Sequence, residues 1–258
     1  MVNFDFSNVK EEYGDNPLDI ELLSNVSGAY IAANKMIFNN LDLSDHVKTI
    51  LQESVKGTPM VKIGKGLPRL MVVAGIHGNE LAPPIAALKL IDELSRLELK
   101  GTIYIIPFAC PKASMDNRRD FDGADLNRAG HIKGSVSNSI LDKAKELEVS
   151  AIGDFHSTAP NTNPGKEAVF CSENPCHASV QIADFIELNA GSQKIVYEKA
   201  GALFKGAVED ESNLMGIPAV TCEVASPIKY ADKKIVERSL IQMRSFLSYF
   251  GIYDNYIV

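Results

Sequence analysis

From residue 69 onward, the hydrophobic positions follow two patterns that take turns along the chain. Short continuous apolar runs are typical of strands buried on both faces. Apolar residues spaced three or four apart are typical of helices with one buried face. The runs predict strands at 69–75, 102–107, 149–155, 168–171, 195–197 and 219–224. The spacing predicts helices at about 83–97, 140–147, 178–188 and 235–250.

This alternation of strands and helices predicts an α/β fold. We expect a single domain with a mostly parallel mixed sheet and helices on both faces. Residues 1–58 are harder to interpret: 25–40 is a candidate helix, and the role of this segment stays open. Ligand sites in such sheets gather at the carboxyl ends of the strands, so polar motifs directly after a strand are the candidates for chemistry.

Composition excludes several classes of protein. With 258 residues, 45% hydrophobic and 23% charged, the chain is typical of a globular protein. A net charge of −7 without a basic block disfavours nucleic-acid binding. No apolar run approaches the roughly 18 residues that span a bilayer, and no signal segment is evident, so we expect a cytoplasmic protein. The four cysteines favour reduced thiols, and Cys171, Cys176 and His177 lack the further pair that a tetrahedral zinc site needs.

Two histidine-containing motifs follow predicted strands. In Gly75-Ile-His-Gly-Asn-Glu80, His77 and Glu80 could converge on one metal ion, or Glu80 could simply belong to a helix start capped by Asn79. In Gly153-Asp-Phe-His-Ser-Thr158, His156 would complete a set of two imidazoles and one carboxylate. That set suits zinc and leaves a coordination position open. The alternative for His156 is a hydrogen bond to a backbone carbonyl.

Two charged motifs complete the candidates. The loop 117–128 carries three arginines, which could bind a carboxylate or polarise a carbonyl, or could pair locally with the loop's aspartates. Glu223 stands in the apolar strand 219–224, where a carboxylate is costly unless it is paired or functional. It could act as a general base, or it could face solvent at the strand end.

The order of these motifs along the chain resembles the zinc carboxypeptidase superfamily, including its succinylglutamate desuccinylase/aspartoacylase branch. The motifs that carry the resemblance are Gly-Ile-His-Gly-Asn-Glu, Gly-Ala-Asp-Leu-Asn-Arg, Asp-Phe-His-Ser and Thr-Cys-Glu-Val. The resemblance implies a zinc carboxypeptidase-like fold, with residues 1–258 as one catalytic domain and 59–250 as the zinc hydrolase core. It also implies one Zn²⁺ ion held by His77, Glu80 and His156.

The resemblance further implies roles for the residues around the ion. Glu223 would be the general base for the metal-activated water. Arg119, or else Arg118, would polarise the scissile carbonyl. Asp125 would orient the first metal-bound histidine.

Substrate-binding roles follow from the same resemblance. Asn127 and Arg128 would hold a free carboxylate of the substrate, and Tyr197 would be a mobile residue that caps it. If Lys205 points into the side-chain pocket, an acidic terminal residue would be favoured, whereas a surface position is the alternative for this lysine.

The function implied is a zinc-dependent, metallocarboxypeptidase-like hydrolase that cleaves an amide bond next to a free carboxylate. Its partner would be a small-molecule or peptide substrate, with no nucleic acid and no membrane. An N-acyl-amino-acid deacylase of the desuccinylase/aspartoacylase type is the alternative. A non-catalytic binding module on the same fold is a second alternative.

Overall fold

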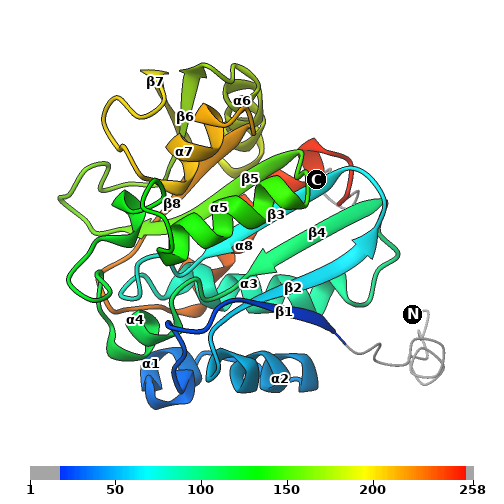
Figure 1. Cartoon of the computed structure of the whole chain (residues 1–258), viewed down its shortest axis with the longest axis vertical. Helices are drawn as coiled ribbons and strands as arrows, with labels where there is room; N and C mark the ends of the chain where they lie inside the picture. The colour runs from blue at the N-terminus through cyan, green and yellow to red at the C-terminus, as the bar shows by residue number, and fades with distance from the viewer. Residues whose placement is uncertain (1–17, 254–258) are drawn as a thin grey trace, which may run out of the picture.

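The computed structural model describes residues 18–253, whose strands form one mixed sheet (Figure 1). The strand order is β1-β2-β4-β3-β5-β8-β6-β7. Neighbours pair in parallel at β4/β3, β3/β5, β5/β8 and β6/β7, and in antiparallel fashion at the other three junctions. The strands are β1 (Asp19–Ser24), β2 (Thr58–Lys65), β3 (Arg69–Ala74), β4 (Gly101–Ile106), β5 (Ala151–Thr158), β6 (Ala168–Asn174), β7 (Gln193–Lys199) and β8 (Ala219–Ala225).

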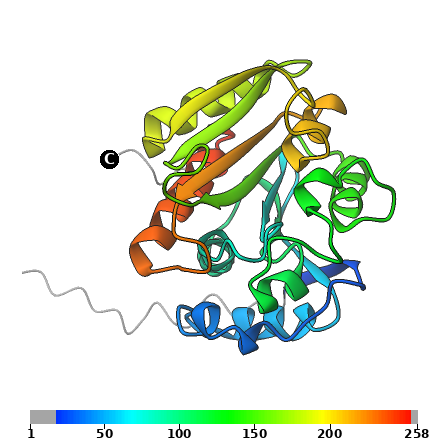
Figure 2. The ribbon, with the colours of Figure 1, turned by 90° about the vertical axis from the view of Figure 1, so that its left-hand side faces the viewer.

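Helices cover both faces of the sheet, as the sequence predicts (Figure 2). One face packs against α2 (Asp45–Ser54), α3 (Ala82–Leu94), α6 (Ala178–Ala190) and α8 (Lys233–Tyr249). The other face packs against α4 (Pro111–Asp116), α5 (Val136–Glu146) and α7 (Val208–Leu214). The predicted fold class, a single α/β domain with a mostly parallel mixed sheet, is therefore confirmed.

The central strands are apolar on both sides because both faces are covered. In β3, Leu70 and Val72 belong to the core beneath α3 and α8, whereas Met71 and Val73 belong to the core beneath α5. All four side chains are fully buried. The continuous apolar run is the consequence of this position in the middle of the sheet.

The direction of the chain changes between β3 and β5. From β3 the chain passes through α3 to β4 on one side, and from β4 it returns through α5, on the opposite face, to β5 on the other side of β3. Such a reversal opens a crevice at the carboxyl ends of the two strands. The candidate residues after β3 and at the end of β5 therefore lie at the same edge of the sheet.

The N-terminal part differs most from expectation. Instead of one helix over 25–40, the structure has a short 3₁₀ helix, Ile31–Ala33, and a separate helix α1, Lys35–Phe38. The side chain of Asn34 accepts hydrogen bonds from the backbone N–H groups of Met36 and Ile37, so it starts a new helix at this point. Strand β1 and helix α2, which the pattern did not predict, join this segment to the main sheet and its core.

Two further observations concern expectations from composition. The four cysteines are all free thiols. Among residues 18–253, no helix is both long and apolar enough to cross a membrane.

Candidate active site

The loop between β3 and α3 places His77 and Glu80 at the carboxyl end of the sheet. Gly75 has a φ of +73°, and a Cβ at Gly78 would come within 2.0 Å of the Ala113 backbone. A tight turn against α4 therefore requires glycine at both positions. The alternative for Glu80, a place in the first turn of a helix capped by Asn79, is not what the structure shows. Helix α3 begins after Leu81, which is its N-cap residue and makes no side-chain capping bond.

His156 and Glu223 come to the same place through the register of β5 and β8. They are direct partners in this parallel pair, so their side chains share one face of the sheet. The neighbouring residue Cys222 points to the opposite face and is buried in the core beneath α8. Because side chains alternate between the two faces of a strand, Glu223 faces the site while the Cys222 thiol faces the core.

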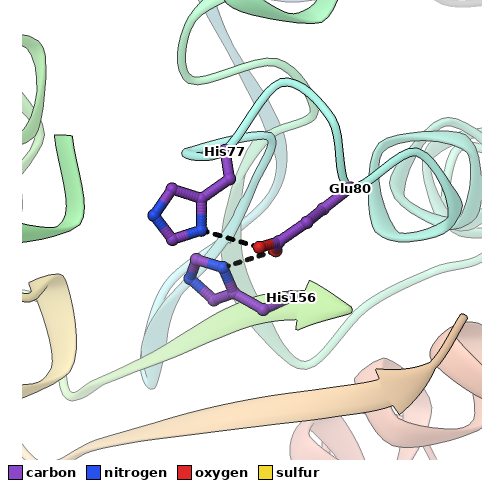
Figure 3. Close-up of side chains that lie close together, drawn as sticks. All are labelled: His77, Glu80 and His156. Atoms are coloured by element: carbon purple, nitrogen blue, oxygen red, sulfur yellow. Dashed lines mark hydrogen bonds and ion pairs between the residues drawn. The ribbon is translucent and has the colours of Figure 1, made fainter. Parts of the chain in front are cut away.

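His77, Glu80 and His156 point toward one another (Figure 3). The Nδ1 atoms of the two imidazoles lie 2.8 Å from Glu80 Oε1 and Oε2, respectively. One ligand atom from each residue lies within 4.8 Å of the others. Within residues 18–253, no other group of three or more His, Cys, Asp or Glu side chains meets in this way.

Carboxylates hold the outer side of both imidazoles. Asp125 Oδ1 lies 2.9 Å from His77 Nε2, and Asp154 Oδ2 lies 2.9 Å from His156 Nε2. Each carboxylate favours a proton on Nε2 and so leaves the Nδ1 lone pair for a metal. Two nitrogen donors and one carboxylate, buried and oriented in this way, fit a zinc ion with an open position.

The electrostatics of the cluster favour a positive charge at its centre. Although burial alone would raise the pKa of Glu80, the His77 and His156 rings lower it well below its ordinary value. Burial alone would lower the pKa of His156, yet Asp154 and Glu80 raise it well above its ordinary value. The carboxylates around the two imidazoles thus favour a positive charge at this place, a condition that a divalent metal ion satisfies.

Glu223 lies beside this cluster with a free oxygen. Its Oε2 atom is buried and has no hydrogen-bond partner within the described residues. Burial and the Glu80 carboxylate raise the pKa of Glu223 to about 8. A carboxyl group with a raised pKa and an unused oxygen in a cavity has the properties of a general base or acid.

The structure separates the two candidate arginines of the loop. Arg119 donates hydrogen bonds to Asp125 Oδ2, at 3.1 and 3.2 Å, and to Glu80 Oε1, at 3.3 Å. Arg118 pairs instead with Asp120 and has a side chain that is 60% exposed. Of these two arginines, only Arg119 lines the cavity above the cluster.

Asn127 and Arg128 also line this cavity, which has a volume of about 260 Å³. Asn127 Oδ1 accepts a hydrogen bond from the backbone N–H of Val208, at 3.1 Å, and its amide nitrogen lies 3.4 Å from His156 Nε2. The Arg128 guanidinium lies over the Phe204 ring, 5.0 Å from its centroid. Within residues 18–253, Arg128 forms no ion pair with a carboxylate, so its charge is available to a ligand.

Two predicted residues do not reach the cavity. Tyr197 stacks on Phe170, with 5.8 Å between the ring centroids, and meets the edge of Phe204. It therefore packs against two aromatic residues that line the cavity and is not itself part of the lining. Lys205 is exposed at the surface and is not part of the lining, because the neighbouring Phe204 turns inward instead.

The structure also adds residues that the sequence analysis missed. Asp154 could have been found, because side chains two apart on a strand share a face and His156 was already a candidate. Glu209, in the first turn of α7, lines the cavity although it is only 3% exposed. No pattern in the sequence separates it from the acidic residues beside it.

Comparisons with known proteins show the family and agree with this fold. A model of the succinylglutamate desuccinylase/aspartoacylase catalytic domain matches residues 66–249. The chain therefore belongs to this family, whose named activities are hydrolytic. No curated protein sequence matches the chain.

Solved structures show the same fold. An aspartoacylase family protein from Mesorhizobium loti is 25% identical, with a TM-score of 0.58 over 77% of this chain and 63% of that one. The product-bound ectoine utilization protein EutE (DoeB) from Ruegeria pomeroyi is 17% identical, with a TM-score of 0.64 over 80% and 65%. A succinylglutamate desuccinylase from a Silicibacter species is 20% identical, with a TM-score of 0.62 over 80% and 65%. The chain thus spans just under two thirds of the length of these three proteins.

Proposed function

We propose that the protein is a zinc-dependent hydrolase that cleaves an amide bond next to a free carboxylate. The observation that carries this proposal is the convergence of His77, Glu80 and His156 beside the unpartnered oxygen of Glu223. A structural zinc site would have four protein ligands, whereas this set has three and opens into a cavity. An open position beside a buried carboxyl group is the arrangement expected of hydrolysis.

The residues around the cluster can divide the chemistry between them. Zinc held by His77, Glu80 and His156 would supply a Lewis acid that polarises the amide and activates water. Glu223 would take a proton from the attacking water at Oε2 and deliver it to the leaving nitrogen. Arg119 would hold a positive charge where the carbonyl oxygen becomes negative.

Arg128 would bind and orient the substrate. Its guanidinium lines the cavity and has no carboxylate partner among the described residues, so it can take the substrate's carboxylate in a bidentate manner. Membership in the desuccinylase/aspartoacylase family favours an N-acyl amino acid as substrate. A peptide with a free C-terminus has the same carboxylate next to the scissile amide and is the second candidate.

A metal analysis and a substrate screen test this proposal. The purified full chain should contain about one zinc ion per molecule and should hydrolyse N-acyl amino acids or short peptides in a chelator-sensitive way. Glu223→Gln should retain zinc and lose about 100- to 10,000-fold in kcat. Glu198→Gln, which makes the same change at an exposed position on β7, is the matched control and should behave as wild type.

Two results would contradict the proposal. If Glu223→Gln hydrolyses substrate at the wild-type rate, the assignment of the base is wrong. If the protein binds zinc and amino acids with a free carboxylate but hydrolyses no member of the screen, the binding-module alternative is favoured.

A further inference from the structure

The part of the cavity next to Arg128 combines aromatic walls with one acidic side chain. Phe170 and Phe204 form the walls, and their rings meet at 73° with 6.4 Å between centroids. Glu209 is the carboxyl group that α7 contributes to the same lining. This composition differs from the metal cluster, where imidazole and carboxylate groups dominate.

Glu209 is firmly held and has no cationic partner. Its Oε1 atom accepts hydrogen bonds from Ser172 Oγ, at 3.0 Å, and from Asn213 Nδ2, at 2.7 Å. The adjacent Asp210 is 2% exposed, and its Oδ2 atom is buried without a hydrogen-bond partner. Within residues 18–253, no Lys, Arg or His forms an ion pair with either carboxyl group. Two buried carboxyl groups without a cation are costly for a folded protein unless they serve a purpose.

Local contacts place Glu209 near the residues that would hold the substrate's carboxylate. The backbone N–H of Val208, which precedes it, donates to Asn127 Oδ1. The Arg128 guanidinium lies on the ring of Phe204, which also lines the cavity. A substrate whose carboxylate is bound by Arg128 would therefore direct the side chain of the same amino acid along the aromatic walls toward Glu209.

We propose that Glu209 is a specificity-determining residue that selects an amino acid with an ammonium group at the end of an aliphatic side chain. The inference rests on the proposed function, because it concerns the amino acid released from the scissile amide. Aromatic walls suit the methylene stem and attract the cation at their faces, and the carboxylate at the end accepts its hydrogen bonds. The expectation based on Lys205 is a substrate with an acidic side chain, whereas this proposal calls for a cationic one. Lys205 lies at the surface, outside the cavity.

The electrostatics of the free protein are consistent with this role. Burial and the Asp210 carboxylate raise the pKa of Glu209 well above its ordinary value. Both causes act against a negative charge on Glu209, and a bound ammonium group would act in the opposite direction by stabilising that charge.

A matched pair of substrates tests the inference. N-acetyl-L-lysine and N-acetyl-L-norleucine have side chains of nearly the same length, but only lysine ends in an ammonium group. We expect the wild-type protein to favour the lysine compound by about 10- to 100-fold in kcat/KM, which is the range for a hydrogen-bonded charge. Glu209→Gln, which keeps the shape and the two accepted hydrogen bonds, should abolish this preference mainly through KM. Glu198→Gln should retain it.

Binding of the free amino acids gives a second readout that does not depend on hydrolysis. L-lysine should bind more tightly than L-norleucine to the wild-type protein by the same factor in calorimetric titration, and Glu209→Gln should remove the difference. If the wild-type protein favours norleucine or treats both compounds equally, the inference is overturned, although chelator-sensitive hydrolysis would still support the proposed function. If neither compound is hydrolysed, the proposed function fails for this substrate class, and the titration alone decides whether Glu209 selects a cation.

Discussion

Asp154→Asn tests the geometry of the metal site through a residue that would not itself bind the metal. Asp154 is fully buried, and its Oδ2 atom is 2.9 Å from His156 Nε2. The substitution keeps the size of the side chain but removes its negative charge. We expect zinc to bind more weakly, because the His156 ring would lose the partner that orients it and increases its basicity.

The size of the effect follows from the hydrogen bonds around the ring. Removing such a carboxylate costs about 10- to 100-fold in metal affinity, equivalent to about 1.4 to 2.8 kcal/mol. We expect the upper end of this range. If the new amide presents its NH₂ group, His156 Nε2 must accept, and the ring proton moves to Nδ1, the atom that faces Glu80. The amide of Asn127, 3.4 Å from the same Nε2 atom, cannot restore the lost charge.

The assay is a competition titration of zinc between the protein and a fluorescent chelator. Wild type and Asp154→Asn are compared with Asp142→Asn, a matched change at an exposed position of α5. Circular dichroism and thermal unfolding of the metal-free proteins establish that each variant folds. We expect Asp154→Asn to bind about 100-fold more weakly and Asp142→Asn to bind as wild type does.

One result would refute this reasoning. If folded Asp154→Asn binds zinc as tightly as wild type, the orientation of the His156 ring does not govern the site. The role of Asp154 in holding a metal-bound His156 would then have to be abandoned.

Three further predictions concern residues around the cavity. Arg119→Ala should reduce kcat by about 100- to 1000-fold, as expected for the loss of one oxyanion-stabilising group, whereas Arg118→Ala should leave kcat unchanged; equal losses in steady-state assays would contradict the separation of the two arginines. Lys205→Ala should not change the ratio of kcat/KM between glutamate- and leucine-containing substrates, and a selective loss on the glutamate compound would restore Lys205 to the pocket. Glu209→Gln should become more stable relative to wild type as the pH rises above about 4.3, the ordinary pKa of glutamate. The reason is that burial raises the pKa of Glu209 in the folded wild type, which therefore binds one proton more than the unfolded chain above about pH 4.3. The free energy of unfolding of the wild type then falls by up to about 1.4 kcal/mol per pH unit, until the pH reaches the pKa of Glu209 in the folded protein. Thermal unfolding of both proteins between pH 5 and 8 measures the difference, and identical pH slopes would count against it.

Much of the fold and the centre of the site could be predicted from the sequence because the signals are local. A continuous apolar run predicts a strand buried on both faces wherever it lies in the chain, as β3 shows. The period of two in a strand predicts that Glu223 and Cys222 point to opposite faces, and they do. The carboxyl ends of neighbouring parallel strands meet at one edge, so His77 and His156 could be expected to converge before any coordinates were known.

The remaining features depended on the tertiary structure, because they are set by the packing of segments that are distant in the sequence. The break between Ile31–Ala33 and α1 and the pairing of β1 with β2 depend on such contacts. Neither residue type nor spacing shows which of two adjacent arginines turns inward, and only the path of the loop over His77 selects Arg119. The sign of the charge in the cavity also depended on the tertiary structure. Lys205 and Glu209 stand only four residues apart, so the composition of the segment does not show which of them enters the cavity. The position of α7 against the sheet places Glu209 inside and Lys205 at the surface.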